Sequence, residues 1–146
     1  MKKAIVVDID GVILDSSKVL CEIEKLHGGE KWNYFNKYCN SDDIKLMPNI
    51  KPFIYSFGKD VDVIISTARS EFIRPQTARK LTKHRVYFSD MLMRDYNDYR
   101  VAVEVKKDHI KKIRDEFGYE IIAFIDDEIE NLNMAKEMGI LSLRAV

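Results

Sequence analysis

The chain has 146 residues, of which 24 are basic and 24 acidic, so its formal net charge is zero. This length predicts one domain with its own hydrophobic core, and an apolar content of 46% argues against disorder. No apolar run is long enough for a transmembrane helix, and the first apolar stretch is too short for a signal peptide. Cys21 and Cys39 form no metal-binding pattern. We therefore expect reduced thiols in a cytoplasmic protein that does not contact membranes.

Strands and helices are expected to alternate along the chain. The first half predicts a strand at 4–7, a helix at 18–26 that Gly28 and Gly29 end, one or two short helices within 31–47, and a helix at 48–57. The second half predicts a strand at 61–66, a basic helix at 71–82, a strand at 86–88, a loop with short extended pieces at 91–105, a helix at 106–117, a strand at 121–125, a helix at 128–138 and a strand at 141–143. This alternation predicts an α/β fold with a mostly parallel central sheet and helices on both faces.

We find no linker or internal repeat, so residues 1–146 are predicted to form a single domain. Within it, residues 14–47 are expected to form a small helical cap. The aromatic side chains between Trp32 and Tyr38 would either cover the functional site as a lid or belong to the core.

The charge is unevenly distributed. Residues 69–114 contain 13 Lys or Arg against 6 Asp or Glu, while the rest of the chain contains 11 against 18. The basic segment predicts either solvated helix surfaces or a surface for a polyanionic substrate.

Acidic pairs follow two of the predicted strands. Asp8 and Asp10 come directly after the first strand and, being two residues apart on an extended chain, point to the same side. Asp126 and Asp127 follow the strand at 121–125. A single D-x-D is usually a turn or a cap, but two acidic pairs at two strand ends would repel one another unless a hard cation such as Mg²⁺ bound between them.

Two further residues have an ordinary structural interpretation when taken alone. Thr67 ends the strand at 61–66 and would either cap the following helix or bind a phosphate oxygen. Lys106 begins the helix at 106–117 and would either be exposed, as Lys107 is expected to be, or face the site.

Together these residues resemble the four motifs of the haloacid dehalogenase-like (HAD) phosphatase superfamily, which has a Rossmann-like fold. Asp8 to Val12 match the D-x-D-G-[TV] motif, Thr67 the hydroxyl motif, Lys106 the lysine motif and Asp126–Asp127 the acidic pair. The resemblance implies that Asp8 is the nucleophile and Asp10 the general acid and base, while Lys106 and Thr67 stabilise the phosphoryl oxygens. It also implies a Mg²⁺ cofactor, held by Asp8, Asp10, Asp126 and Asp127.

A narrower resemblance is to the 3'-phosphatase domains of polynucleotide kinases, those of bacteriophages in particular. Arg94, Asp98 and Arg100 precede Lys106 at that family's intervals, and Thr67, Ala68 and Arg69 match its [ST]-[GA]-R motif. The resemblance implies that Thr67, Ala68, Arg69, Arg94 and Arg100 bind a phosphorylated nucleic-acid end, with Asp98 pairing with an arginine instead. Glu128 departs from the pattern, because the phage enzyme has a basic residue there. No P-loop, the phosphate-binding motif of the kinase half, occurs in the sequence. A separate kinase or ligase is a candidate partner.

Three functions follow as hypotheses. The first is a Mg²⁺-dependent 3'-phosphatase for DNA or RNA ends. The second is a HAD phosphatase for small metabolites such as nucleotides or sugar phosphates. The third is an inactive binding module that keeps the fold, against which the intact motif residues argue.

Overall fold

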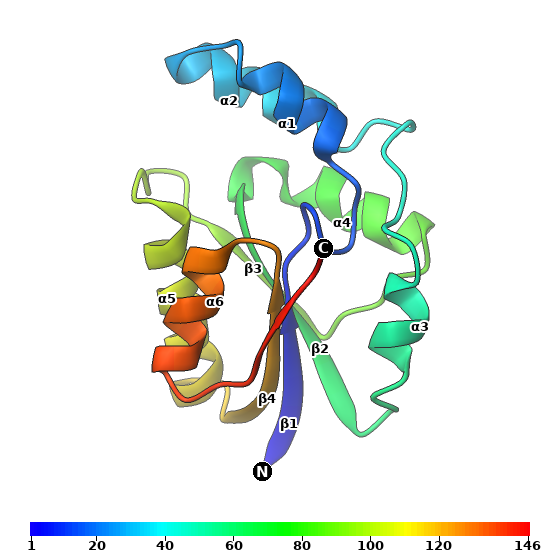
Figure 1. Ribbon diagram of the computed structural model, residues 1–146, viewed down its shortest axis with the longest axis vertical. Coiled ribbons are helices and arrows are strands. Elements are labelled where there is room, and N and C mark those ends of the chain that lie inside the picture. Colours follow the sequence, from blue (N-terminus) through cyan, green and yellow to red (C-terminus); the bar gives the residue numbers. More distant parts are fainter.

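A computed structural model describes all residues, 1–146, and shows a five-stranded, all-parallel sheet in the order β3-β2-β1-β4-β5 (Figure 1). The strands are β1 (Lys2–Val7), β2 (Val61–Ser70), β3 (Asp90–Arg94), β4 (Tyr119–Asp126) and β5 (Ser142–Arg144). The helices are α1 (Ser17–Ile23), α2 (Gly28–Tyr38), α3 (Ile50–Tyr55), α4 (Arg74–Lys83, after the 3-10 turn η1, Glu71–Ile73), α5 (Ala102–Asp115) and α6 (Ile129–Glu137). The predicted α/β fold with a parallel sheet is thus confirmed.

Both faces of the sheet are covered, which explains why the first strand is apolar at every position. Ala4 and Val6 face a core that includes Ile110 and Ile113 of α5. Ile5 and Val7 belong to a second core on the opposite face. Figure 1 shows α5 and α6 on one side of the sheet and α3 and α4 on the other. A strand buried on both faces needs a continuous apolar run, as 4–7 provides.

The strand order reverses at β1, which lies between β2 and β4. In parallel sheets of this kind, ligands bind outside the carboxyl ends of the strands at such a reversal. The residues after β1, β2 and β4 therefore meet at the expected position of the site.

The helices α1 and α2 lie beyond the carboxyl end of the sheet (Figure 1). Two adjacent segments connect these helices to the rest of the fold. They are joined by backbone hydrogen bonds from the Asp15 N–H to the Lys45 carbonyl and from the Met47 N–H to the Ile13 carbonyl, each 2.8 Å long. Within α2, Phe35 is buried in the core, whereas Trp32 is 57% exposed. The aromatic segment is thus divided between core and surface.

One predicted strand is wrong. Residues 86–88 form no strand, and β3 lies at Asp90–Arg94, where a loop was expected. Arg85 has a φ of 58°, and the Val86 N–H bonds to the Leu81 carbonyl at 2.9 Å. Val86 is therefore buried just after α4, in a left-handed turn of the kind that commonly ends a helix.

Two predicted helix boundaries also differ. Gly28 and Gly29 begin α2 instead of ending the helix before it, and α5 begins at Ala102, four residues before Lys106. The start at Ala102 places Lys106 in the second turn of α5. None of the helices combines the length and apolarity that a membrane span requires.

Candidate active site

Three carboxylates gather at the carboxyl ends of β1 and β4. The Asp8 N–H bonds to the Ile125 carbonyl at 3.0 Å, which aligns the two strand ends. Asp8, Asp126 and Asp127 each offer one oxygen, and these oxygens lie within 4.8 Å of one another. Asp8 and Asp126 are buried. Such a set of oxygen donors fits a hard divalent cation.

Lys106 reaches into this cluster from α5. Its Nζ lies 3.0 Å from Asp8 Oδ1 and 2.6 Å from Asp126 Oδ2, and the residue is only 2% exposed. Burial alone would lower the lysine pKa, but the attraction of the two carboxylates outweighs burial and raises it. Lys106 is therefore held as a cation at the centre of the site.

One lysine does not balance the negative charge of the cluster. Burial raises the pKa of Asp8 to about 8 against the pull of Lys106, and the negative charges of Asp126 and Asp10 add to the rise. Burial and Asp126 likewise raise the pKa of Asp127 to about 6. A bound cation would relieve both effects, so the electrostatics agree with the oxygen geometry.

Asp126 has two further contacts that the sequence did not predict. Asn131 of α6 is 3% exposed and donates from Nδ2 to both carboxylate oxygens, at 3.2 and 3.3 Å. The Glu128 N–H donates to Oδ1 at 2.9 Å. The sequence could have indicated Asn131 by its position, one turn into the helix that follows the acidic pair. A side chain at such a position can reach back to the end of the strand.

Gly11 allows the turn after β1 to approach Asp127. Its φ is +83°, and a Cβ atom at this position would lie 2.2 Å from Asp127 Oδ2. Only glycine meets both conditions.

Gly11→Ala should therefore lower both stability and activity. Backbone strain alone costs about 1–3 kcal/mol, and displacement of Asp127 should reduce kcat/KM by on the order of tenfold or more. Gly118→Ala is the matched control, since Gly118 has a φ of +75° and a Cβ atom added there would meet no other atom within 4 Å. Urea unfolding and phosphatase assays measure both effects. Equal losses in the two variants would show that the approach to Asp127 has no effect.

The carboxylate of Asp10 does not join this acidic cluster but forms a bidentate ion pair. Arg69 donates to it from Nε at 3.0 Å and from Nη2 at 2.7 Å, and Ser16 Oγ donates at 2.5 Å. Burial would raise the Asp10 pKa, but these partners, Arg69 foremost, lower it. The carboxylate of Asp10 is thus held ionised in one orientation.

Arg69 was expected to bind substrate, but its guanidinium is occupied within the protein. Besides Asp10 it contacts Asn40 Oδ1 at 2.6 Å, Thr77 Oγ1 at 3.3 Å and the Cys39 carbonyl at 3.2 Å, and the residue is 3% exposed. Because Cys39 and Asn40 directly follow α2, Arg69 also links the end of α2 to Asp10. Arg69 thus holds the Asp10 carboxylate in place.

The other residues expected to bind substrate lie around the end of β2. Thr67 is 1% exposed, and its Oγ1 accepts from the Arg69 N–H at 3.1 Å, which leaves the hydroxyl proton free to donate. The Ala68 carbonyl accepts from Arg94 Nε at 3.1 Å. Arg100 pairs with Asp98 and with Asp108. The expectation that Asp98 pairs with an arginine is therefore confirmed, and Arg100 borders the site without contacting the acidic cluster.

The basic segment 69–114 keeps much of its positive charge unpaired. Five of its 13 cations form ion pairs with carboxylates, namely Arg69, Arg74, Lys83, Arg100 and Lys106. Lys80, Arg94 and Arg114 bond to backbone carbonyls, which do not neutralise them.

Beside Thr67, a buried histidine links α5 to β2 and β3. His109 Nε2 lies 3.1 Å from the Met93 carbonyl, which only accepts, so this nitrogen carries the proton. Nδ1 then accepts from Ser66 Oγ at 2.8 Å. Burial lowers the pKa of His109 to about 4. The charged groups around the ring are Lys106, Asp95, Asp108 and Glu71.

His109 should contribute less stability in mild acid. Below its ordinary pKa of 6.5 the unfolded chain binds a proton that the folded chain refuses until about pH 4. The stability that depends on His109 is therefore complete above pH 6.5 and falls by about 2 kcal/mol between pH 7.5 and pH 5. The raised pKa values of Asp8 and Asp127 act in the opposite direction over the same range, so the effect of His109 is measured as a difference between variants. In urea unfolding, the stability of His109→Gln should rise relative to that of the wild type by about 2 kcal/mol from pH 7.5 to pH 5, whereas His27→Asn, at an exposed histidine, should follow the wild type. The same pH dependence in His109→Gln and the wild type would exclude this contribution of His109.

Comparisons with known proteins agree with this geometry. A family model described as HAD superfamily, subfamily IIIB (acid phosphatase) matches residues 1–145. No curated protein matches the chain significantly.

Solved structures share the fold at low identity. A chain of the Pnkp1/Rnl/Hen1 RNA repair complex has a TM-score of 0.75 and 22% identity, covering 99% of this chain and 42% of that one. A haloacid dehalogenase-like hydrolase from Streptococcus pneumoniae has a TM-score of 0.72 and 16% identity, with coverages of 98% and 84%. The class C acid phosphatase from Bacillus anthracis has a TM-score of 0.63 and 22% identity, with coverages of 89% and 53%. The chain spans less than half of the RNA-repair protein that it resembles.

Proposed function

Because the chain belongs to the HAD superfamily, subfamily IIIB acid phosphatases, and is a phosphatase, we propose that it removes the 3'-phosphate from nucleic-acid ends in a Mg²⁺-dependent reaction. The chemistry rests on one observation, the buried cluster in which Lys106 faces Asp8 and Asp126 at the switch point of the sheet. The substrate class is supported by the motif residues around Arg94 and by the likeness to a chain of an RNA repair complex.

In the proposed reaction Asp8 attacks phosphorus in line and forms an aspartyl-phosphate, while the bond from phosphorus to the 3'-oxygen breaks. Asp10, which is ionised in the free protein, takes up a proton when the phosphate binds and gives it to the leaving oxygen. In the second step Asp10 takes a proton from the water that attacks the aspartyl-phosphate, which releases phosphate and restores Asp8. Asp10 loses the proton gained from water when the phosphate leaves, so the cycle balances.

The remaining residues hold charges in place. Lys106 and the Thr67 hydroxyl face the oxygens on which charge develops. Asp8, Asp126 and Asp127 would hold Mg²⁺, with Asp10 contributing through its backbone carbonyl. The bound cation would offset the repulsion between the Asp8 carboxylate and the phosphate. Arg69 orients Asp10, and Asn131 orients Asp126.

A substrate panel tests the proposal. Oligonucleotides of DNA and RNA with a 3'-phosphate should be hydrolysed with a higher kcat/KM than 3'-mononucleotides, and EDTA should abolish turnover until Mg²⁺ is restored. Equal rates on mononucleotides would instead favour a phosphatase for small metabolites, which the acid phosphatase description of the family also accommodates. Full activity in EDTA would contradict the assignment of the metal. An inactive binding module does not agree with membership in a phosphatase family.

A further inference from the structure

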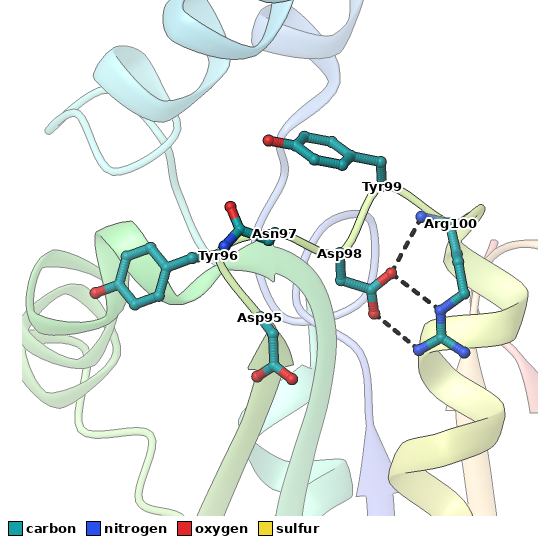
Figure 2. A pocket seen from close by; sticks show the side chains of 6 residues that line it. All are labelled: Asp95, Tyr96, Asn97, Asp98, Tyr99 and Arg100. Atoms are coloured by element: carbon teal, nitrogen blue, oxygen red, sulfur yellow. Dashed lines mark hydrogen bonds and ion pairs between the residues drawn. The ribbon is translucent and has the colours of Figure 1, made fainter.

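The loop between β3 and α5 carries two tyrosines without partners. Tyr96 is 66% exposed and Tyr99 is 89% exposed. They lie on an open surface formed by residues 95–100. Figure 2 shows both rings projecting away from the loop, without hydrogen bonds to the other residues drawn. Neither ring contributes to the core, so a role in folding does not account for them.

Hydrogen bonds from two arginine side chains, Arg94 and Arg100, brace the loop that carries these rings. Arg94 donates to the Asp98 carbonyl at 3.1 Å and also to the Arg100 carbonyl. The Arg100 guanidinium grips the Asp98 carboxylate at 3.0 and 2.8 Å (Figure 2). A preorganised loop loses little conformational entropy when a ligand binds to it. The two rings are therefore presented to solvent on a fixed support.

The loop follows β3 and therefore lies at the carboxyl edge of the sheet, the same edge as the candidate active site. At one end Arg94 bonds to the Ala68 carbonyl, next to Thr67. At the other end the chain enters α5, which delivers Lys106 to Asp8. A polynucleotide with its terminal phosphate at Asp8 must leave the site across a neighbouring surface, and this loop is such a surface.

The charges of the loop are balanced, since Arg94 and Arg100 stand against Asp95 and Asp98, so the rings and not bulk charge would attract an occupant. The Arg94 guanidinium contacts only carbonyl oxygens, so no carboxylate pairs directly with it. Its positive charge can therefore face one phosphate of a strand whose bases lie on the adjacent rings. Aromatic side chains stack on every base because every base has a π face.

On the premise of the proposed function, we propose that Tyr96 and Tyr99 form a stacking platform for unpaired bases next to the 3' end. The platform selects single-stranded polynucleotide ends over mononucleotides without reading the sequence. It supplies affinity through stacking, which the balanced charge of the loop does not supply.

The test compares kcat/KM for a 3'-phosphorylated oligothymidylate with kcat/KM for p-nitrophenyl phosphate, in the full chain with Mg²⁺. The ratio of the two should fall about tenfold or more in the Tyr96→Ala/Tyr99→Ala variant, as expected from the loss of base stacking. The Tyr96→Phe/Tyr99→Phe variant keeps both rings and should retain the wild-type ratio. Tyr87→Ala is the matched control, because Tyr87 is 60% exposed but lies before β3, at the opposite end of the sheet. Its ratio should also equal that of the wild type.

A second measurement separates stacking from a structural effect. Abasic sites next to the 3' end should lower the ratio of the wild type and leave that of the double alanine variant unchanged. If the wild type prefers the oligonucleotide and the alanine variant keeps that preference, the platform is wrong and the proposed function stands. If the wild type hydrolyses p-nitrophenyl phosphate but shows no preference for an oligonucleotide over a mononucleotide, the proposed function fails, and the platform fails with it.

Discussion

The Asp8→Asn variant should lose phosphatase activity by about 10³-fold or more, as removal of a nucleophile does in other enzymes with covalent intermediates. An amide cannot attack phosphorus as a carboxylate does, and it binds a cation more weakly. The fold should persist, because the change removes one of two negative charges that face a single lysine. Activity on p-nitrophenyl phosphate and thermal unfolding of the same preparation measure the two effects.

The matched control for this variant is Asp115→Asn, which makes the same chemical change at an exposed position near the end of α5. It should keep full activity. Rapid turnover by Asp8→Asn with unchanged KM would contradict the role of Asp8 as nucleophile. A sharp fall in its melting temperature would instead show that Asp8 serves mainly to hold Lys106.

The Lys106→Ala variant should lose both activity and stability. Without the lysine, Asp8 and Asp126 remain buried and close together with no counter-charge. Breaking a buried ion pair in this way costs about 3 kcal/mol. The lost stabilisation of the phosphoryl oxygens should lower kcat by about 10²–10³-fold. Urea unfolding in EDTA and steady-state kinetics in Mg²⁺ measure the two losses. Mg²⁺ should raise the melting temperature of the variant more than that of the wild type, because the cation substitutes for the missing charge.

Lys107→Ala provides the control within the same helix turn. Lys107 is half-buried and forms no ion pair, so its removal should change the free energy of unfolding by less than about 0.5 kcal/mol. A similar loss in both lysine variants would show that the helix turn, and not the charge at Asp8, is responsible. Unchanged kcat in Lys106→Ala would remove this lysine from the catalytic residues.

Most of the fold was predictable because its signals are local. The apolar run at 4–7 is continuous because β1 is buried on both faces, and the acidic pairs stand at strand ends, where a parallel sheet brings them together. The predicted strand at 86–88 was wrong because a local pattern can fit more than one structure. A buried Val86 at a helix end and a buried residue in a strand leave the same pattern in a sequence, and only pairing with β2 identifies Asp90–Arg94 as the strand.

The contacts of the site residues were less predictable than their identities. Arg69 occurs in a motif that suggests phosphate binding, yet its partners Asp10 and Asn40 lie 59 and 29 residues away along the chain. Asn131 gave only a positional signal, its place one turn into the helix after the acidic pair, because its contact depends on the distance between α6 and the end of β4. Such contacts depend on how elements pack, which periodicity does not encode.

The sequence by itself determined the alternation of strands and helices, the parallel sheet and the set of acidic and basic residues from which a phosphatase site is built. These follow from the period of apolar residues and from charged side chains placed directly after buried strands. Only the tertiary structure decided which charges pair. In the structure Arg69 pairs with Asp10, and Lys106 lies between Asp8 and Asp126. Tyr96 and Tyr99 remain exposed at the same edge of the sheet. The physical reason is that the strength of an ion pair depends on distance and burial, and both are set by residues far apart in the chain.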